Sequence, residues 1–163
     1  MSDVHKLVVM GVSGCGKSTV GAALAGALGA VFVDGDALHP PSNIAKMAAG
    51  TPLNDHDRAP WLELVGAELA KAGGRVIACS ALKRRYRDII RAQEPSAVFV
   101  HLHGAAAVLQ ARMQTRPGHF MPPALLQSQL ATLEPLGQGE AGMVIDIALP
   151  LNDQISAVRA ALA

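Results

Sequence analysis

The sequence predicts an α/β domain built on a parallel five-stranded sheet that helices cover on both sides, in three layers. Three observations favour this fold: short apolar runs recur along the chain, helical segments separate them, and aromatic residues make up only 3%, so aliphatic side chains must fill the core. A short apolar run fits a strand that is buried on both faces. Strands that alternate with helices indicate βαβ units with right-handed crossovers.

The five expected strands are the apolar runs at residues 7–10, 31–33, 76–79, 98–100 and 143–147. The expected helices, which are rich in Ala, Leu and charged residues and end in turn-forming residues, lie at residues 18–28, 60–72, 84–92 and 105–115. A closing helix is expected after Pro150, with Asn152 as its N-cap and apolar residues recurring at helical spacing.

The chain of 163 residues fits a single domain, residues 1–163, because no repeat and no flexible linker divides it. Half of the residues are hydrophobic and the formal net charge is +1, a balance that does not favour a nucleic acid as partner. The two cysteines lack metal-site spacing, which indicates a reducing compartment and favours the cytoplasm. The apolar run near the N-terminus is far shorter than the ~20 residues of a membrane span, so no membrane partner is expected.

Residues 11–18 read GVSGCGKS and match the phosphate-binding pattern GxxxxGK[ST]. They directly follow one apolar run and directly precede a helical segment, which is the context that a P-loop requires. Backbone N–H groups and the positive end of the new helix would hold phosphate oxygens, Lys17 would reach the β- and γ-phosphates, and Ser18 would ligate Mg²⁺. The alternative is a glycine-rich turn that merely joins strand to helix.

The sequence thus predicts an ATP site on the P-loop NTPase fold. The expected nucleotide contacts from this loop are Gly11, Ser13, Gly14, Cys15, Gly16, Lys17, Ser18 and Thr19.

Two carboxylates, Asp34 and Asp36, directly follow the second apolar run. Ligands of doubly wound sheets bind at the carboxyl ends of the strands, so we assign Asp34 to the Mg²⁺ shell and Asp36 to the acceptor hydroxyl, as hydrogen-bond acceptor or general base. His39 is a candidate hydrogen-bond partner for a substrate hydroxyl. The alternative is that the aspartates are turn and cap residues, because Asp-Gly favours turns, and that His39 is structural or faces solvent.

Four segments carry a resemblance to a known family: DGDALHPPSNIAKM at 34–47, GTPLNDHDRAPWL at 50–62, ACSALKRRYRD at 78–88, and GHFMP at 118–122 with its continuation to residue 129. Together with the P-loop they are similar to the motifs of the gluconokinase family, over nearly the whole chain. The resemblance implies phosphorylation of D-gluconate to 6-phospho-D-gluconate with ATP and Mg²⁺. It also implies a fold similar to nucleoside monophosphate kinases and shikimate kinase, and a homodimer.

Gluconate is a polyhydroxylated carboxylate, so its site should offer cations for the carboxylate and polar groups for the hydroxyls. We place Arg58, Lys83 and Arg87 there as the cations. A solvated basic helix face is the alternative for the run at 83–87. With the residues that the resemblance and the expected lid add, the predicted substrate contacts are Asp36, His39, Lys46, Arg58, Lys83, Arg87, His119 and Gln129.

A small helical lid is expected at about residues 112–130, after the fourth strand. Arg112 and Arg116 lie four residues apart on one helical face, and Pro117-Gly118 then breaks the helix. A segment that closes over ATP would aim both guanidinium groups at the phosphates and exclude water. Arg116 then joins Lys17 and Asp36 as a predicted catalytic residue. The alternative is a surface helix with two exposed arginines.

No acidic residue ends the third apolar run, which passes into Ser80 where many P-loop enzymes carry a carboxylate. The metal would then depend on Ser18, phosphate, water and Asp34. Two other functions stay open on these observations: another small-molecule kinase of the same fold, such as a shikimate kinase, and a nucleotide-dependent switch that transfers no phosphate. ADP release that depends on a polyol acid distinguishes a kinase from a switch.

Overall fold

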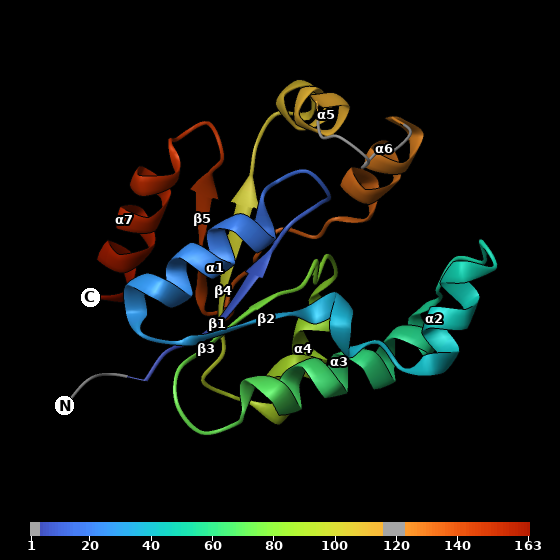
Figure 1. The fold of residues 1–163 in the computed structure, drawn as a ribbon, viewed down its shortest axis with the longest axis horizontal. Coiled ribbons are helices and arrows are strands. Elements are labelled where there is room, and N and C mark those ends of the chain that lie inside the picture. The colour runs from blue at the N-terminus through green and yellow to red at the C-terminus, as the bar shows by residue number, and fades with distance from the viewer. Residues whose placement is uncertain (1–3, 116–122) are drawn as a thin grey trace.

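The centre of the molecule is a parallel sheet of five strands in the order β2-β3-β1-β4-β5 (Figure 1). The computed structural model describes residues 4–115 and 123–163, with side chains up to residue 112 and from residue 125. The strands are β1 (Lys6–Met10), β2 (Val31–Asp34), β3 (Arg75–Ala78), β4 (Val98–His103) and β5 (Gly142–Asp146). The predicted α/β fold on a parallel five-stranded sheet is confirmed.

β1 lies in the middle of the sheet, and all five of its residues are buried. Leu7 stands opposite Val76 of β3 and Val98 of β4, so the three central strands are aligned. Because successive side chains point to opposite faces, Leu7 joins one hydrophobic cluster and Val8 joins the other. Burial on both faces explains why residues 7–10 form an unbroken apolar run.

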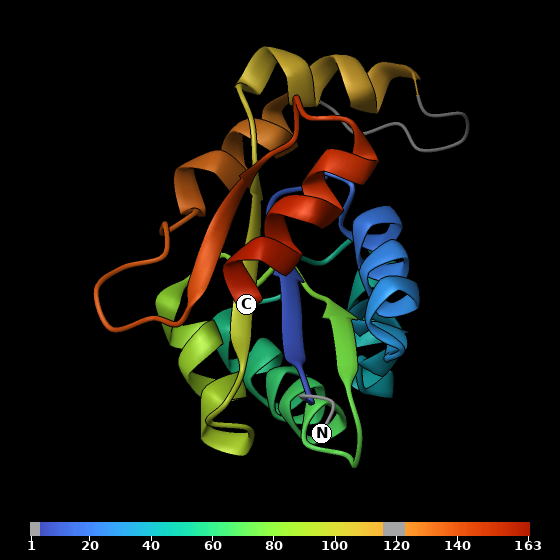
Figure 2. The same cartoon turned by 90° about the vertical axis from the view of Figure 1, so that its left-hand side faces the viewer.

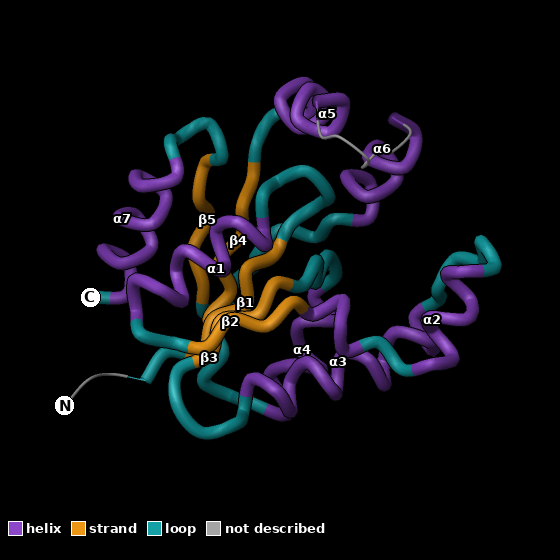
Figure 3. Tube along the Cα trace, in the orientation of Figure 1, coloured by secondary structure: helices purple, strands orange, loops and turns teal. Residues whose placement is uncertain are grey.

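Helices cover both faces of the sheet, as Figures 2 and 3 show. They are α1 (Lys17–Leu28), α2 (Pro41–Ala48), α3 (Asp55–Leu69), α4 (Arg84–Gln93), α5 (Ala106–Thr115), α6 (Pro123–Thr132) and α7 (Leu151–Leu162), with a 3₁₀ helix η1 (Gly35–Leu38). α1 and α7 contact each other on one face, where Leu24 and Val158 share a cluster. α3 and α4 contact each other on the opposite face, where Leu62 and Ile90 are buried. These are the three predicted layers.

The other helices gather toward the carboxyl ends of the strands. α5 and α6 lie at the end to which β4 and β5 point, and α2 reaches away from the sheet (Figures 1 and 2). Each strand of the sheet therefore delivers the residues that follow it to the same edge, which is where doubly wound sheets bind ligands. Within the described part of the chain, no helix combines the length and the apolar character needed to cross a membrane.

Helix α3 begins at Asp55, five residues before its predicted start at residue 60. Asn54 caps it by accepting a hydrogen bond from the N–H of Asp57, and the Asp57 carboxylate in turn accepts from the N–H of Asn54. This reciprocal cap satisfies two backbone donors at the helix start, and Pro60 lies inside the helix. The prediction of the helix itself was right, but its boundary was wrong.

Candidate active site

The P-loop joins the buried end of β1 to the first turn of α1. Gly11, Gly14 and Gly16 all have positive φ angles, of 145°, 86° and 91°. A Cβ on Gly11 would come within 2.7 Å of the Leu102 carbonyl oxygen and 2.8 Å of the Cys15 Sγ. Only glycine fits at this position, and its lack of a side chain lets the loop wrap tightly, so that backbone N–H groups can line a phosphate site.

Lys17 lies folded across this loop. Its Nζ donates hydrogen bonds to the carbonyl oxygens of Gly11 at 3.0 Å and Val12 at 3.2 Å. The ammonium group is thus held against the backbone of the P-loop, and its contact with the β- and γ-phosphates stays a prediction.

The predicted metal ligands lie together. The Ser18 Oγ is 3.5 Å from the Asp34 Oδ2, and the other Asp34 oxygen accepts a hydrogen bond from the N–H of Asp36 at 3.0 Å. Two hard oxygen donors beside a phosphate cradle fit Mg²⁺, which prefers oxygen ligands and retains several waters. Among the described residues, no group of three or more His, Cys, Asp or Glu side chains could hold a metal. Phosphate oxygens and water would therefore complete the coordination of Mg²⁺ here.

Asp36 is exposed at the start of η1, just past the carboxyl end of β2. The Cys79 thiol, whose pKa burial raises to about 12, has Lys17 nearby, which lowers that pKa, and Asp36 and Asp34, which raise it. One buried sulfur atom therefore lies within electrostatic reach of the ammonium group and both carboxylates. The predicted phosphate, metal and acceptor residues converge on the same edge of the sheet.

Burial also raises the pKa of Cys15 inside the loop, more than the neighbouring Lys17 lowers it. A thiol is reactive as a thiolate, so Cys15 fills space below the cradle as an inert side chain. Its predicted contact with the nucleotide would come from its backbone.

Arg112 on α5 lies beside the P-loop. Its Nη2 donates to the Ile147 carbonyl oxygen at 2.7 Å, and a Cβ built on Gly16 would be 3.8 Å from its Nη1. A guanidinium group at this position suits a role on phosphates. The two other predicted lid residues, Arg116 and His119, lie outside the described residues.

Gln129 on α6 reaches the P-loop directly, because its Oε1 accepts a hydrogen bond from the N–H of Ser13 at 2.8 Å. The sequence assigns this residue to the substrate. The structure instead places its side chain on the P-loop, where it accepts a hydrogen bond from a backbone N–H group of the loop.

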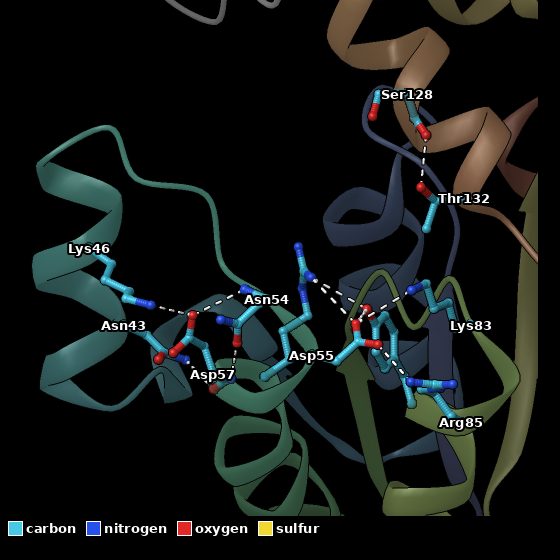
Figure 4. A network of polar contacts seen from close by, with 11 residues as sticks. Asn43, Lys46, Asn54, Asp55, Asp57, Lys83, Arg85, Ser128 and Thr132 are labelled. Carbon is cyan, nitrogen blue, oxygen red and sulfur yellow. Dashed lines mark hydrogen bonds and ion pairs between the residues drawn. The ribbon is translucent and has the colours of Figure 1, made fainter.

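A cation-rich group lies between the start of α3 and the start of α4 (Figure 4). The Asp55 carboxylate lies 2.7 Å from Arg85, 3.4 Å from Lys83 and 4.0 Å from Arg58, and it accepts a hydrogen bond from the Tyr86 hydroxyl. The Tyr86 hydroxyl, and after it the cations Lys83 and Arg85, lower the pKa of Asp55. One carboxylate faces three cations, so the group keeps an excess of positive charge and is suited to bind an anion.

Arg58 and Lys83 also lie near the ring of Tyr86. The Arg58 Cζ is 5.7 Å and the Lys83 Nζ is 5.5 Å from the ring centroid, within the range of cation–π attraction. The Arg58 Nη1 also donates a hydrogen bond to the Tyr86 hydroxyl oxygen, at 3.3 Å. Two of the predicted substrate cations, which lie 25 positions apart in the numbering, are thus brought together by a tyrosine that the sequence did not single out.

A second ion pair lies beside this group. The Nζ of Lys46 on α2 is 2.7 Å from the Oδ2 of Asp57 on α3. This hydrogen bond from Lys46, more than any other contact, lowers the pKa of Asp57. Figure 4 shows the pair beside the Asp55 group, with Asn43 close to Asp57. His39 precedes α2, stacks on Trp61 and contacts Asn43.

The structure contradicts the predicted substrate contact of Arg87. The side chain is fully buried, and its Nε and Nη2 donate to the two oxygens of the buried Glu140 carboxylate, at 2.6 Å and 2.9 Å. Its Nη1 donates to the Ala81 carbonyl oxygen at 2.9 Å. A bidentate pair satisfies both side chains, so Arg87 ties α4 to the segment before β5 and is not available to a ligand.

Sequence reasoning missed Asp55, Tyr86, Asn43 and Glu140. Asp55 and Asn43 lie inside the motifs at 50–62 and 34–47, but nothing in their spacing marked them as partners of basic or aromatic side chains. The Arg87–Glu140 pair spans 53 positions, a separation at which no local pattern predicts contact.

A phosphate-binding loop that follows a central parallel strand, with a serine–aspartate pair and a further carboxylate on the adjoining edge, defines a P-loop small-molecule kinase. Comparison with known proteins narrows this class. A family model described as shikimate kinase matches residues 13–138. The gluconokinase of Gluconobacter oxydans (strain 621H) is 55% identical over 138 residues, which cover 82% of this chain and 78% of that protein.

The thermoresistant gluconokinase of Escherichia coli (strain K12) is 44% identical over 160 residues, covering 94% of this chain and 91% of that protein. The crystal structure of a gluconokinase from Sinorhizobium meliloti 1021 superposes with a TM-score of 0.88 at 51% identity, covering 97% of this chain and 91% of that one. A shikimate kinase from Acinetobacter baumannii, 20% identical with a TM-score of 0.68, shares the fold. The chain belongs to the gluconokinase family of shikimate kinase-like proteins.

Proposed function

We propose that this protein phosphorylates D-gluconate to 6-phospho-D-gluconate with ATP. The observation that carries the proposal is the excess positive charge around Asp55, between the starts of α3 and α4. A sugar acid has the carboxylate that such a group would bind, and the hydroxyls that a neighbouring carboxylate can activate. The relatives that cover most of the chain, and which bear the name gluconokinase, support this choice of acceptor.

In this proposal the backbone N–H groups of residues 11–19 and the Lys17 ammonium group bind the phosphates of ATP. Ser18 and Asp34 hold Mg²⁺, which supplies neutralisation of the phosphate charge when it is bound. When ATP binds, its phosphate oxygens would replace the loop carbonyl oxygens as the acceptors of the hydrogen bonds that Lys17 donates. Arg112, together with Arg116 from the lid, neutralises charge that develops on the transferred group.

Asp36 orients and deprotonates the acceptor hydroxyl. Its carboxylate accepts the proton as the oxygen attacks the γ-phosphorus. Arg58 and Lys83 bind the carboxylate of gluconate, while Lys46 and His39 form hydrogen bonds with its hydroxyls. His119 is proposed as a further contact to the same substrate. The acceptor is thereby held between Asp36 and the cationic group.

We also propose that the protein is a homodimer in the cytoplasm. The two unpaired cysteines, both buried, are typical of a reducing compartment. Sedimentation analysis tests the assembly, and a mass of one chain at micromolar concentration would contradict it.

A coupled assay of ADP release across a panel of acceptors tests the function. Gluconate is expected to give the highest ATP-dependent turnover among gluconate, shikimate, glycerate, nucleoside monophosphates and glucose. Higher or equal turnover with another acceptor would overturn the choice of gluconate. ADP release that no acceptor stimulates would overturn the assignment as a kinase.

A further inference from the structure

His39 follows η1 at the edge of the candidate active site, and two side chains hold its ring. The ring stacks on Trp61, with centroids 4.1 Å apart and planes inclined by 15°. The His39 Nδ1 lies 3.2 Å from the Asn43 Nδ2. Trp61 is itself fixed, because its Nε1 donates to the Gly35 carbonyl oxygen at 2.8 Å. The ring is therefore held on one face and at one nitrogen.

The orientation of the Asn43 amide follows from its other neighbour. Asn43 is buried, and its Nδ2 lies 3.0 Å from the backbone carbonyl oxygen of Asp57. A carbonyl oxygen only accepts, so the amide must present its NH₂ group there, and a flipped amide would set two acceptors against each other. The contacts to Asp57 and to His39 thus both belong to the NH₂ group.

An amide NH₂ group cannot accept a hydrogen bond, so the His39 Nδ1 must do so. A ring nitrogen that accepts carries no proton, and the proton of the neutral ring then sits on Nε2. Asn43 thereby selects one tautomer of His39, and it opposes the doubly protonated cation, which would have no lone pair on Nδ1.

The burial of the ring agrees with this protonation state. Burial is the main cause that lowers the pKa of His39, Arg58 lowers it further, and Asp36 raises it without reversing the direction. The direction of this shift favours the neutral ring. Within the described part of the chain, the His39 Nε2 has no hydrogen-bond partner.

We propose that His39 binds the acceptor as a neutral hydrogen-bond donor through Nε2, and that Asn43 and Trp61 are positioning residues that fix its tautomer and its plane. The proposal rests on the proposed function for the identity of the acceptor. This donor role of His39 complements the role of Asp36. A hydroxyl both donates and accepts, so the carboxylate accepts hydrogen bonds from the polyol and the imidazole donates one. The Nδ1–H tautomer would turn Nε2 into an acceptor and leave no such pair.

The tautomer is measured on the unaltered protein by long-range ¹H–¹⁵N NMR with labelled histidine at neutral pH. The expected pattern for His39 is a pyrrole-like Nε2 and a pyridine-like Nδ1. His56 is the internal control, because it is exposed and the described residues give its ring no hydrogen-bond partner; its signals should average between tautomers. An Nδ1–H or doubly protonated His39 would overturn the inference, whatever the acceptor proves to be.

The donor role is tested by two variants. His39→Phe keeps the stack on Trp61 and removes the donor, whereas His39→Gln places an amide N–H close to the position of Nε2. We expect His39→Phe to lower kcat/KM for gluconate by about threefold to tenfold, the range of one hydrogen bond, with the affinity for ATP unchanged. His39→Gln should recover much of that loss.

Equal losses in the two variants, with unchanged thermal melting, would overturn the donor role. A protein that showed the expected tautomer but did not phosphorylate gluconate would overturn the proposed function, and with it the donor role toward this acceptor. The NMR pattern therefore separates a failure of the tautomer from a failure of the function.

Discussion

Asp34 and Asp36 are two positions apart, but the backbone gives their side chains different surroundings. Asp34 caps η1 with one oxygen and approaches Ser18 with the other. The Asp36 carboxylate is exposed and takes no hydrogen bond from any described residue. A carboxylate that is committed to a cap suits a fixed metal ligand, and one that is uncommitted suits a base that must exchange a proton with substrate.

The first prediction concerns this division of roles. Asp36→Asn keeps the size of the side chain but removes its charge and its capacity to take a proton. We expect kcat to fall by roughly 10²- to 10⁴-fold, the usual contribution of general-base assistance, with ATP affinity nearly unchanged. Steady-state kinetics and nucleotide titration measure the two quantities.

Asp34→Asn is the matched control, and it should chiefly weaken the binding of Mg·ATP. A near-normal kcat in Asp36→Asn would make Asp36 a turn residue. Loss of Mg·ATP binding in that variant would exchange the roles of the two aspartates.

At this scale the sequence predicts residues whose chemistry depends on neighbours in the chain. The P-loop and the two aspartates belong to this group, because their spacing alone places them at a strand end. The role of Arg87 could not be predicted in this way, because its partner Glu140 comes from a distant segment of the chain. A motif marks that a basic residue is needed, but it does not say whether a ligand or a buried carboxylate neutralises it.

Helix α6 reaches the P-loop through the Gln129 side chain. Gln129 occupies the Ser13 N–H, one of the donors that line the cradle. If a phosphate of ATP takes this donor, it would compete with Gln129 for it.

Gln129→Glu tests this link between α6 and the loop. A carboxylate on the Ser13 N–H would place a negative charge where phosphate must bind, so we expect the Kd for ATP to rise by about tenfold or more, equivalent to 1.4 kcal/mol. Gln129→Leu removes the competition without adding charge. Its affinity for ATP, measured by calorimetry, should equal or exceed that of the unaltered protein; equal Kd values in all three proteins would exclude the link.

The predicted lid supplies a third test. Arg116→Ala should lower kcat far more than it weakens nucleotide binding, because a lid arginine acts on charge that develops at the transferred phosphoryl group. Such an arginine contributes ~10³-fold or more to the rate. Rapid-quench kinetics would report the loss in the chemical step. An unchanged kcat would instead support the alternative, in which Arg116 is a solvated arginine on a helix surface.

The strands were the most predictable elements, since burial on both faces makes them unbroken apolar runs. Helix α2, in contrast, was not expected, although Pro41 at its first turn fits the preference of that position. The order of the strands could not be predicted from their sequences, because β3 lies between β1 and β2 by long-range pairing alone.

Two buried groups contribute strongly to how the whole molecule responds to acid. Burial lowers the pKa of His101 from 6.5 to about 4. For Glu140, burial raises the pKa, but the hydrogen bonds from Arg87, Gly137 and Arg91 outweigh it and lower the pKa from 4.5 to about 2. In both cases the unfolded chain binds the proton first, so stability falls with falling pH.

We therefore expect the free energy of unfolding to decrease in two steps, between pH 6.5 and 4 for His101 and between pH 4.5 and 2 for Glu140. Each step is at most about 3 kcal/mol. Urea denaturation at a series of pH values measures them. His101→Leu should flatten the first step alone; a first step that persists in this variant would assign it to another group.

The chain contains a single tryptophan, and Trp61 is only 4% exposed, between the core and the stacked His39. All intrinsic indole fluorescence of the molecule therefore originates within one ring contact of the proposed acceptor site. Gluconate that engages His39 should change the intensity of this emission at constant wavelength, whereas unfolding should shift it to the red. A titration in which gluconate is turned over without any change in emission would separate Trp61 from the acceptor. With no dye or added label, the protein carries its own optical probe of occupancy.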